Sequence, residues 1–236
     1  MAKTFINHNG KIVNIMEFIK TNIPSKYTIN SKVLNASDYG TPQNRKRLIT
    51  LISSEGSWEF PEPHKNKITV RQAIGHLPSI ESGDTTDIPW HFGRKHNSNH
   101  ILWMKHTPTG KTAFDNKVHF PQTKDKDTGL MRKIKGFRTT YKRIEWDQPS
   151  PTIGMTNGSI NSQNNVHPGT LKDDGTYSDA TALSVKEITI LCGLPEKCFD
   201  IYENEVSENF MRHVIGECFP PKMCLEILKK ITNKEN

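Results

Sequence analysis

This sequence of 236 residues lacks long apolar runs and paired cysteines. No stretch reaches the roughly 18 apolar residues that span a bilayer, and the opening segment MAKTFINHN has no apolar core of a secretory signal. The four cysteines fall in the last 45 residues without C-x-x-C spacing or a nearby histidine pair, which disfavours a zinc site. We therefore predict a cytoplasmic protein without a bound metal, with reduced and packed thiols at Cys192, Cys198, Cys218 and Cys224.

Apolar residues are also scarce. They make up 33% of the chain, and adding the 15 glycines still leaves the total below the roughly 45–50% that is usual in globular proteins. Four tryptophans and ten phenylalanines nevertheless argue against disorder throughout. We expect a folded chain with long polar loops, part of whose core is completed by a partner.

Positive charge is concentrated in the first 147 residues. Lysine and arginine exceed aspartate and glutamate by 5 in residues 1–83 (11 against 6) and by 6 in 84–147 (13 against 7), whereas 148–236 carry −4 (8 against 12). A basic block interleaved with aromatic residues is typical of a polyanion-binding surface, because each cation near a phosphate releases condensed counterions. A solvated, lysine-rich surface gives the same count, so charge alone leaves both interpretations open.

Hydrophobic periodicity predicts a mixture of helices and strands. Residues 78–140 show little periodicity, and we expect irregular structure with short strands there. Elsewhere the patterns predict helices over 12–22 and 69–77, and strands over 27–34, 48–52 and 141–146.

The C-terminal segment carries the clearest helix signals. Ser184 and Glu187 have the spacing of a capping box, which opens a helix that ends at Gly193. A second helix is expected over 207–215, and a last one begins at Pro220-Pro221. The last helix is expected to carry one apolar stripe, made of Met223, Leu225, Leu228 and Ile231.

The densest chemical signal is the run Gln43-Asn44-Arg45-Lys46-Arg47. Gln43, Arg45 and Arg47 would share one face of an extended segment. Guanidinium groups suit phosphates and base-edge acceptors, and a glutamine amide can both donate to and accept from a base. A solvated basic entrance to a strand is the alternative interpretation.

The segment VLNASDYGTPQNRKRLITLI, residues 33–52, closely resembles the glutamine-arginine-arginine motif region of DNA (cytosine-5) methyltransferases. Three later blocks are similar to further motifs of that family, in the same order. They are YKRIEWDQPSPTI (141–153), which resembles the arginine and proline-threonine motif, ALSVKEITILCGLPEKCF (182–199), and IGECFPPKMCLEILKKI (215–231), which resembles the closing motif.

The resemblance implies a fold and a division into domains. The expected class is α/β (α+β), with the C-terminal part of the class I methyltransferase fold, its edge strands and final helix, joined to a small, mostly β or irregular target recognition domain. Residues 1–80 would supply C-terminal strands of the catalytic domain, 81–180 the target recognition domain, and 181–236 a helical return segment that packs on the catalytic partner.

An intact member of the family also carries a glycine-rich loop for S-adenosylmethionine, a Pro-Cys nucleophile and a Glu-Asn-Val segment, none of which occurs in this sequence. Without a thiolate to add to C6 of cytosine, C5 is not activated. The resemblance therefore predicts the DNA-recognition subunit of a split methyltransferase, inactive alone and completed by a chain that carries those motifs. A fragment of a longer enzyme, a degenerate remnant and a non-catalytic DNA-binding module are the alternatives.

The resemblance also implies residue roles. Arg45 and Arg47 would contact the flipped cytosine and its backbone, with Gln43 bracing the loop. Arg143, Pro151 and Thr152 would have structural roles, and Gly216, Glu217 and Cys218 would border the S-adenosylmethionine site, although the family usually has asparagine in place of Glu217. The residues expected to hold double-stranded DNA, mostly through phosphates, are Arg94, Lys95, Lys105, Lys111, Arg132, Lys133, Lys135 and Arg138. Restriction-modification in a bacterium or phage is the expected setting.

Overall fold

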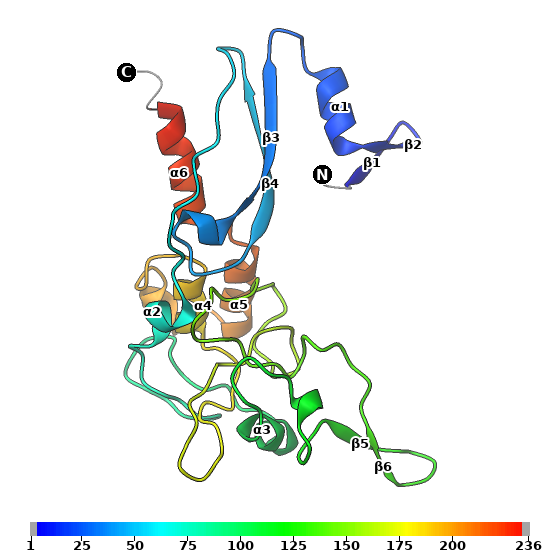
Figure 1. Ribbon diagram of the computed structural model, residues 1–236, viewed down its shortest axis with the longest axis vertical. Coiled ribbons are helices and arrows are strands. Elements are labelled where there is room, and N and C mark those ends of the chain that lie inside the picture. Colours follow the sequence, from blue (N-terminus) through cyan, green and yellow to red (C-terminus); the bar gives the residue numbers. More distant parts are fainter. Residues whose placement is uncertain (1–3, 233–236) are drawn as a thin grey trace.

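The computed structural model describes residues 4–232, with side-chain surroundings given up to 230. Its described strands pair as three separate two-stranded antiparallel sheets, β1–β2, β3–β4 and β5–β6, surrounded by helices and long loops. Figure 1 shows the β3–β4 hairpin with α6 on one side and α1 on the other, and the β5–β6 hairpin at the opposite end of the molecule. Within the described part of the chain, every helix is too short or too polar to cross a bilayer.

The longest sheet is the hairpin of β3 (Thr28–Asn35) and β4 (Lys46–Ser53). The two strands pair along their whole length, from Thr28 opposite Ser53 to Asn35 opposite Lys46. This confirms the strands predicted over 27–34 and 48–52. The loop between them begins with the short 3-10 helix η1 (Ala36–Tyr39) and turns at Gly40, whose φ of 79° favours glycine.

The N-terminal prediction is only partly right. Residues 12–22 do not form one helix, because β1 (Phe5–His8) and β2 (Lys11–Asn14) make a hairpin before α1 (Ile15–Asn22) begins. The Asn9-Gly10 turn has positive φ at both residues, which suits the right-handed twist of a hairpin. The side chain of Asn14 then accepts a hydrogen bond from the Met16 amide and starts the helix one turn later than the apolar pattern indicates.

The last helix, α6 (Pro221–Thr232), packs on the rest of the chain through Met223 of the predicted stripe and through Ile227, which was not part of it. Met223 and Ile227 pack against Leu34, Tyr39 and Phe60 around η1. Leu225 and Leu228 are each 51% exposed, so they do not share one face with the buried Met223, and the side chain of Ile231 lies outside the described residues. The helix therefore carries apolar residues both on its packed face and on its exposed face.

The main core lies under α2 (Val70–Ile74), α4 (Val185–Leu191) and α5 (Glu208–Glu217). The predicted capping box of Ser184 and Glu187 is confirmed, and Thr69 and Gln72 form a second one at α2. The short 3-10 helix η3 (Asp200–Tyr202) follows α4. The core draws on the middle of the chain as well as on the helices; its buried members are Val70, Ile74, Trp90, Ile144, Ile153, Leu183, Val185, Ile188, Leu191, Cys192, Met211 and Ile215.

Residues 78–140 contain the short strands that the sequence predicts, together with helical segments that it does not. Helix α3 (Ser98–Lys105) is capped by Asn97 and was not expected, and η2 (Ala113–Asp115), β5 (Gln122–Lys124) and β6 (Met131–Lys133) follow it. The strand expected over 141–146 is wrong, since this segment makes only isolated bridges. Tyr141 has a φ of 47°, which breaks an extended strand at its first residue.

Arg143 stands at the centre of this region and is completely buried. Its Nη1 donates to the carbonyl oxygens of His167 and Asp179 at 2.7 and 3.1 Å, and its Nη2 donates to that of Met104 at 3.0 Å. Burial lowers the pKa of Arg143 to about 10, so the side chain is still charged at neutral pH. One cation thus joins α3 to two loops that are far away in the sequence.

A second buried polar cluster surrounds His167. Its Nδ1 lies 3.6 Å from Asp179 Oδ2, and its Nε2 lies 3.4 Å from Glu187 Oε1. Burial raises the pKa of Glu187 to about 8 and lowers that of His167 to about 4. At neutral pH the Glu187 carboxyl is therefore protonated next to a neutral imidazole.

Stability is expected to fall by about 2 kcal/mol between pH 6.5 and 8, because the unfolded chain has already lost the Glu187 proton that the folded chain retains. Below pH 6.5 stability is expected to fall as the pH is lowered, because the pKa of His167 is lower in the folded chain than in the unfolded chain. The unfolded chain then binds a proton that the folded chain excludes. Urea unfolding across this range measures the slope. Glu187→Gln should remove the fall above pH 6.5, and an unchanged slope in that variant would contradict the assignment.

Candidate functional site

The loop that leads into β4 is docked on a segment about a hundred residues away. Asn44 N donates to Ser150 O at 2.8 Å, and Ser150 N donates to Pro42 O at 2.9 Å. The Thr152 hydroxyl adds a 2.6 Å hydrogen bond to Asn44 O. These bonds fix the backbone of the loop, so the side chains of residues 43–47 have defined positions.

Gln43 is fully buried beneath this loop. Its Nε2 donates to Cys192 Sγ at the end of α4 at 3.2 Å, while its Oε1 has no hydrogen-bond partner. Burial raises the pKa of the Cys192 thiol to about 11, so the thiol stays protonated. Gln43 therefore braces the loop against the main core instead of facing a ligand.

Arg45 is also buried, with only 5% of its surface exposed. Its Nη1 donates to Ile153 O and its Nη2 to Gly216 O, each at 2.8 Å. Hydrogen bonds from a charged guanidinium are strong, so these two bonds hold both carbonyl oxygens in place. Arg45 therefore joins the loop to the segment after Pro151 and to the end of α5.

Arg47 is the more accessible of the two arginines. Its Nη1 donates to Lys46 O at 2.8 Å, and partial burial together with the nearby positive charge of Arg45 lowers its pKa. Both arginines line an open cavity of about 600 Å³, where three of the motif segments meet. The other lining residues are Thr152, Gly154, Met155, Gly216 and Glu217.

Gly216 allows the close approach that forms this cavity. A Cβ at this position would lie 2.5 Å from Gly154 O and 2.6 Å from Met155 Cα. The backbone atoms of Gly154 and Met155 cannot move aside as the end of a flexible side chain can. Only glycine therefore fits at position 216, between α5 and the segment at 154–155.

Gly216→Ala is expected to destabilise the protein by about 1–3 kcal/mol through overpacking, despite the better helix propensity of alanine. Thermal unfolding measures the effect. Gly154→Ala is the matched control, because a Cβ there meets no atom within 4 Å and the variant should unfold at nearly the wild-type temperature. Equal stability of the two variants would contradict the close-packing interpretation.

The other predicted residues of this region lie at or near the cavity. Glu217 lies at its rim, and one of its carboxylate oxygens is 3.6 Å from His213 Nε2. Cys218 ends α5 and is half-buried. Pro151 is half-buried beside the exposed Thr152. Gly154 and Met155 also line the cavity and were not predicted, although they lie two and three residues after Thr152 and could have been found from the proline-threonine pair.

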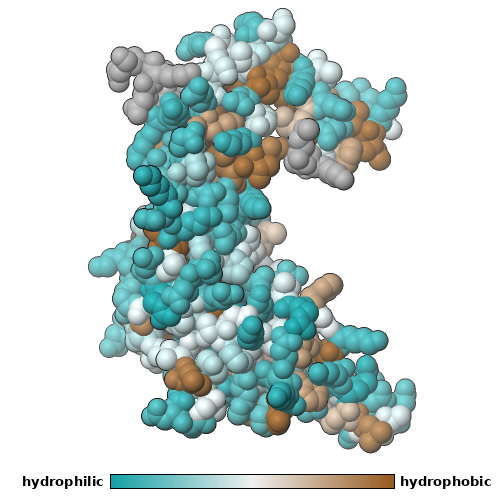
Figure 2. Space-filling view, in the orientation of Figure 1, coloured by the Kyte–Doolittle hydropathy of each residue, from teal (hydrophilic) through white to brown (hydrophobic). Residues whose placement is uncertain are grey.

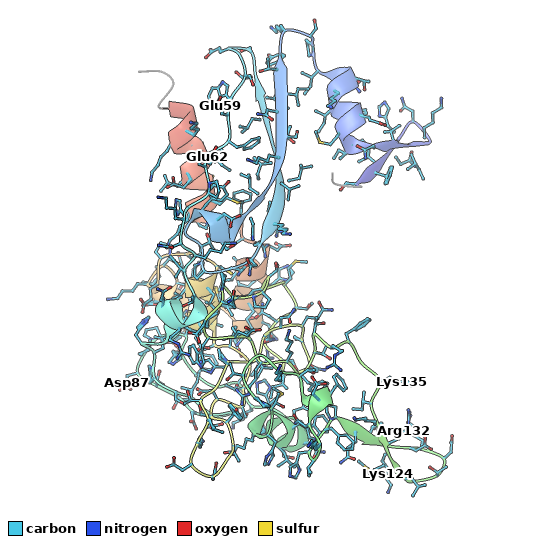
Figure 3. All side chains as sticks on the ribbon, viewed as in Figure 1. Glu59, Glu62, Asp87, Lys124, Arg132 and Lys135 are labelled. Atoms are coloured by element: carbon cyan, nitrogen blue, oxygen red, sulfur yellow. The ribbon has the colours of Figure 1, made fainter. Side chains whose placement is uncertain are left out.

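The predicted DNA-binding residues are spread over two areas. Arg94 lies beside α5, where its Nε is 3.8 Å from a Glu208 carboxylate oxygen. Figure 3 shows Lys124, Arg132 and Lys135 together at the β5–β6 end of the molecule, and Lys124 was absent from the predicted set. Arg94 and Lys105 are partly buried, whereas the exposed members are Lys95, Lys111, Arg132, Lys133, Lys135 and Arg138.

Within residues 4–232, no group of three or more histidine, cysteine, aspartate or glutamate side chains could hold a metal ion. The buried His91 and the partly buried His96 bond to polar protein groups. His91 Nδ1 lies 3.0 Å from the Ser184 hydroxyl, and His96 Nε2 lies 3.1 Å from that of Thr181.

The arrangement of helices and hairpins defines a mixed α/β, methyltransferase-like fold. It resembles the crystal structure of a DNA modification methyltransferase encoded within a prophage (E. coli), with a TM-score of 0.55 and 18% identity over 88% of this chain and 60% of that one. The Entamoeba histolytica methyltransferase EhMeth gives the same TM-score at 10% identity, over 95% of this chain and 59% of that one.

The chain belongs to the C-5 cytosine-specific DNA methylase family, which it matches over residues 3–233. It is 45% identical to the type II methyltransferase M1.HgaI of Avibacterium volantium over 96% of this chain, and 26% identical to M1.HphI of Haemophilus parahaemolyticus over 98%. It spans 61% of the length of the first relative and 54% of the second.

Proposed function

We propose that this chain is the DNA-recognising part of a DNA (cytosine-5) methyltransferase of a restriction-modification system. In this proposal, a methyl group passes from S-adenosylmethionine to C5 of a cytosine swung out of the duplex. The supporting observation is the cavity at Arg45 and Arg47, because the three segments that line it are the ones that resemble methyltransferase motifs.

Within the proposed site the two arginines have different roles. The accessible guanidinium of Arg47 contacts the extruded cytosine or its phosphate. Arg45, whose Nη1 and Nη2 each donate to a backbone carbonyl, positions the loop and the end of α5 around that contact, and Gln43 supports the loop from below. This division refines the sequence-based expectation that both arginines contact the cytosine.

The nucleophile is proposed to come from elsewhere, on a complementary polypeptide or another part of a longer one. C5 methylation needs a thiolate to attack C6. No cysteine in the 236 residues follows a proline, and burial raises the pKa of both Cys218, which adjoins the site, and Cys192, which lies behind Gln43. The division into residues 1–80, 81–180 and 181–236, with the middle part as the target recognition domain, belongs to the same proposal.

The methyl donor would meet this chain at one edge only. Gly216 supplies bare backbone at the cavity, and the carboxylate of Glu217 suits the ammonium group of S-adenosylmethionine, while Cys218 adjoins them. When bound, the donor supplies an electrophilic methyl group. The glycine-rich loop that would hold most of it is proposed to lie with the nucleophile.

A mixing experiment tests the proposal. Tritiated methyl transfer to duplex DNA is measured for this chain, for a chain encoded next to it that carries the glycine-rich loop, Pro-Cys and Glu-Asn-Val motifs, and for both together. Activity is expected only for the mixture. Methylation by this chain alone would contradict the assignment of the nucleophile, and DNA binding without activity in the mixture would favour a non-catalytic DNA-binding module.

A further inference from the structure

The hairpin at the far end from α6 forms a basic projection. We call residues 122–138 the β5–β6 arm; they contain six lysines and arginines against two aspartates, a net charge of +4. Figure 1 shows the β5–β6 hairpin extending away from α3 and the main core, and Figure 2 shows apolar surface among the hydrophilic surface at that end. The exposed apolar side chains of the arm are Leu130, Met131 and Phe137.

The tip of the arm is an ordered turn built around Asp125. Its Oδ1 accepts hydrogen bonds from the Asp127 and Thr128 amides at 3.1 and 3.0 Å and from the Thr128 hydroxyl at 3.1 Å. Gly129, with a φ of 69°, donates to Asp125 O and lets the chain reverse. Because these bonds favour the charged carboxylate, they lower the pKa of Asp125.

The second oxygen of Asp125 holds an arginine. Its Oδ2 lies 3.2 Å from Arg132 Nε, while the Arg132 side chain remains 62% exposed. A lone surface ion pair is worth little in stability. Here, however, the turn already fixes the carboxylate of Asp125, so the ion pair sets the direction of the Arg132 guanidinium. The two terminal nitrogens of that guanidinium remain available as a fork of hydrogen-bond donors.

The pairing of the strands places Arg132 on a different face from the other cations of the hairpin. Thr123 lies opposite Arg132, whereas Lys124 pairs with Met131 and Gln122 with Lys133. Since side chains alternate across a strand, Arg132 and Thr123 share one face and the two lysines share the other. The lysine face suits phosphates, and the arginine face carries a fixed donor pair.

We propose that the β5–β6 arm enters the major groove of duplex DNA and that Arg132, oriented by Asp125, donates two hydrogen bonds to the edge of a guanine. This inference rests on the proposed function and names a specificity-determining residue for it. The major groove is about 12 Å wide and admits a two-stranded ribbon, and an arginine fork matches the O6 and N7 acceptors of guanine. Asp125 is the positioning residue.

A selection experiment tests this role. The full chain, with its complementary chain where needed, is incubated with a library of duplexes randomised over 12 positions, and bound DNA is sequenced. Wild type is expected to prefer guanine at one or more positions. Arg132→Ala should relax one of these preferences by about tenfold to a hundredfold, and Asp125→Asn should relax the same position by a smaller factor.

Lys126→Ala is the matched control, since it removes one exposed positive charge from the same turn. It should weaken binding to all sequences alike and reduce the salt dependence by about one phosphate contact, with base preferences unchanged. A selective wild type whose preferences survive Arg132→Ala would overturn the role of Arg132 and leave the proposed function intact. A chain without affinity for DNA, alone or completed, would overturn both.

Discussion

Arg143→Ala is expected to lower the free energy of unfolding by about 3–5 kcal/mol, the largest effect on stability of any variant considered. The substitution would leave the buried carbonyl oxygens of His167 and Asp179 without this donor, whereas that of Met104 would keep the Thr107 amide. Each buried polar group that loses its partner costs about 1–3 kcal/mol. Such a loss is a large part of the total stability of a domain, so the variant should be substantially unfolded at 37 °C.

Urea unfolding followed by tryptophan fluorescence measures the difference in the free energy of unfolding. The stability of Arg143→Lys should lie between those of wild type and Arg143→Ala, because lysine restores the positive charge but not the forked set of guanidinium donors. Arg138→Ala is the control. Arg138 is an exposed arginine of the same region, paired with Asp115, and its loss should change stability by no more than about 0.5 kcal/mol. Equal unfolding midpoints for Arg143→Ala and Arg138→Ala would disprove the structural role.

Arg47→Ala is expected to reduce turnover of the completed methyltransferase by about a hundredfold, with little change in thermal stability. The expected loss is that of one positioned donor in an active site, and among residues 4–232 the partly buried side chain donates only to the neighbouring Lys46 carbonyl. Rates of methyl transfer under saturating DNA, together with melting temperatures, separate the two effects.

Arg45→Ala gives a different expectation at the neighbouring position. Both turnover and melting temperature should fall, because the carbonyls of Ile153 and Gly216 lose their donor. Lys46→Ala, an exposed cation between the two arginines, is the control and should affect neither strongly. If Arg47→Ala kept wild-type turnover in an active reconstituted enzyme, the cavity would not be the site of cytosine contact.

Local signals predicted much of the fold. The capping box at Ser184 and the apolar spacing beyond it gave α4, an alternating segment gave β3 nearly to the residue, and an apolar run gave the middle of β4. Helix α3 was missed because its apolar residues do not gather on one face, and the turn signal Asn9-Gly10 was overlooked in favour of a longer helical pattern. Pairing between segments far apart in the chain has no local signature.

The candidate site shows the same division. The sequence marked Gln43, Arg45 and Arg47 as one group, and the structure brings Arg45 and Arg47 to one cavity. The sequence could not indicate that the side chains of Gln43 and Arg45 point inwards. Charged and amide side chains are usually exposed, and their burial here depends on backbone groups that are far away in the sequence. The partners Cys192, Ile153 and Gly216 become neighbours only in three dimensions.

The bond from Arg45 to Gly216 spans 171 positions of sequence. During synthesis the arginine leaves the ribosome long before its partner exists, and at about 5–20 residues per second it waits on the order of ten seconds or more. Throughout that interval its Nη2 lacks the Gly216 carbonyl, although Nη1 can already bond to Ile153 O, and the cavity has no wall on the α5 side. Any agent that delays or truncates the last turns of α5 would therefore yield a chain whose cavity lacks the wall formed by Gly216 and Glu217.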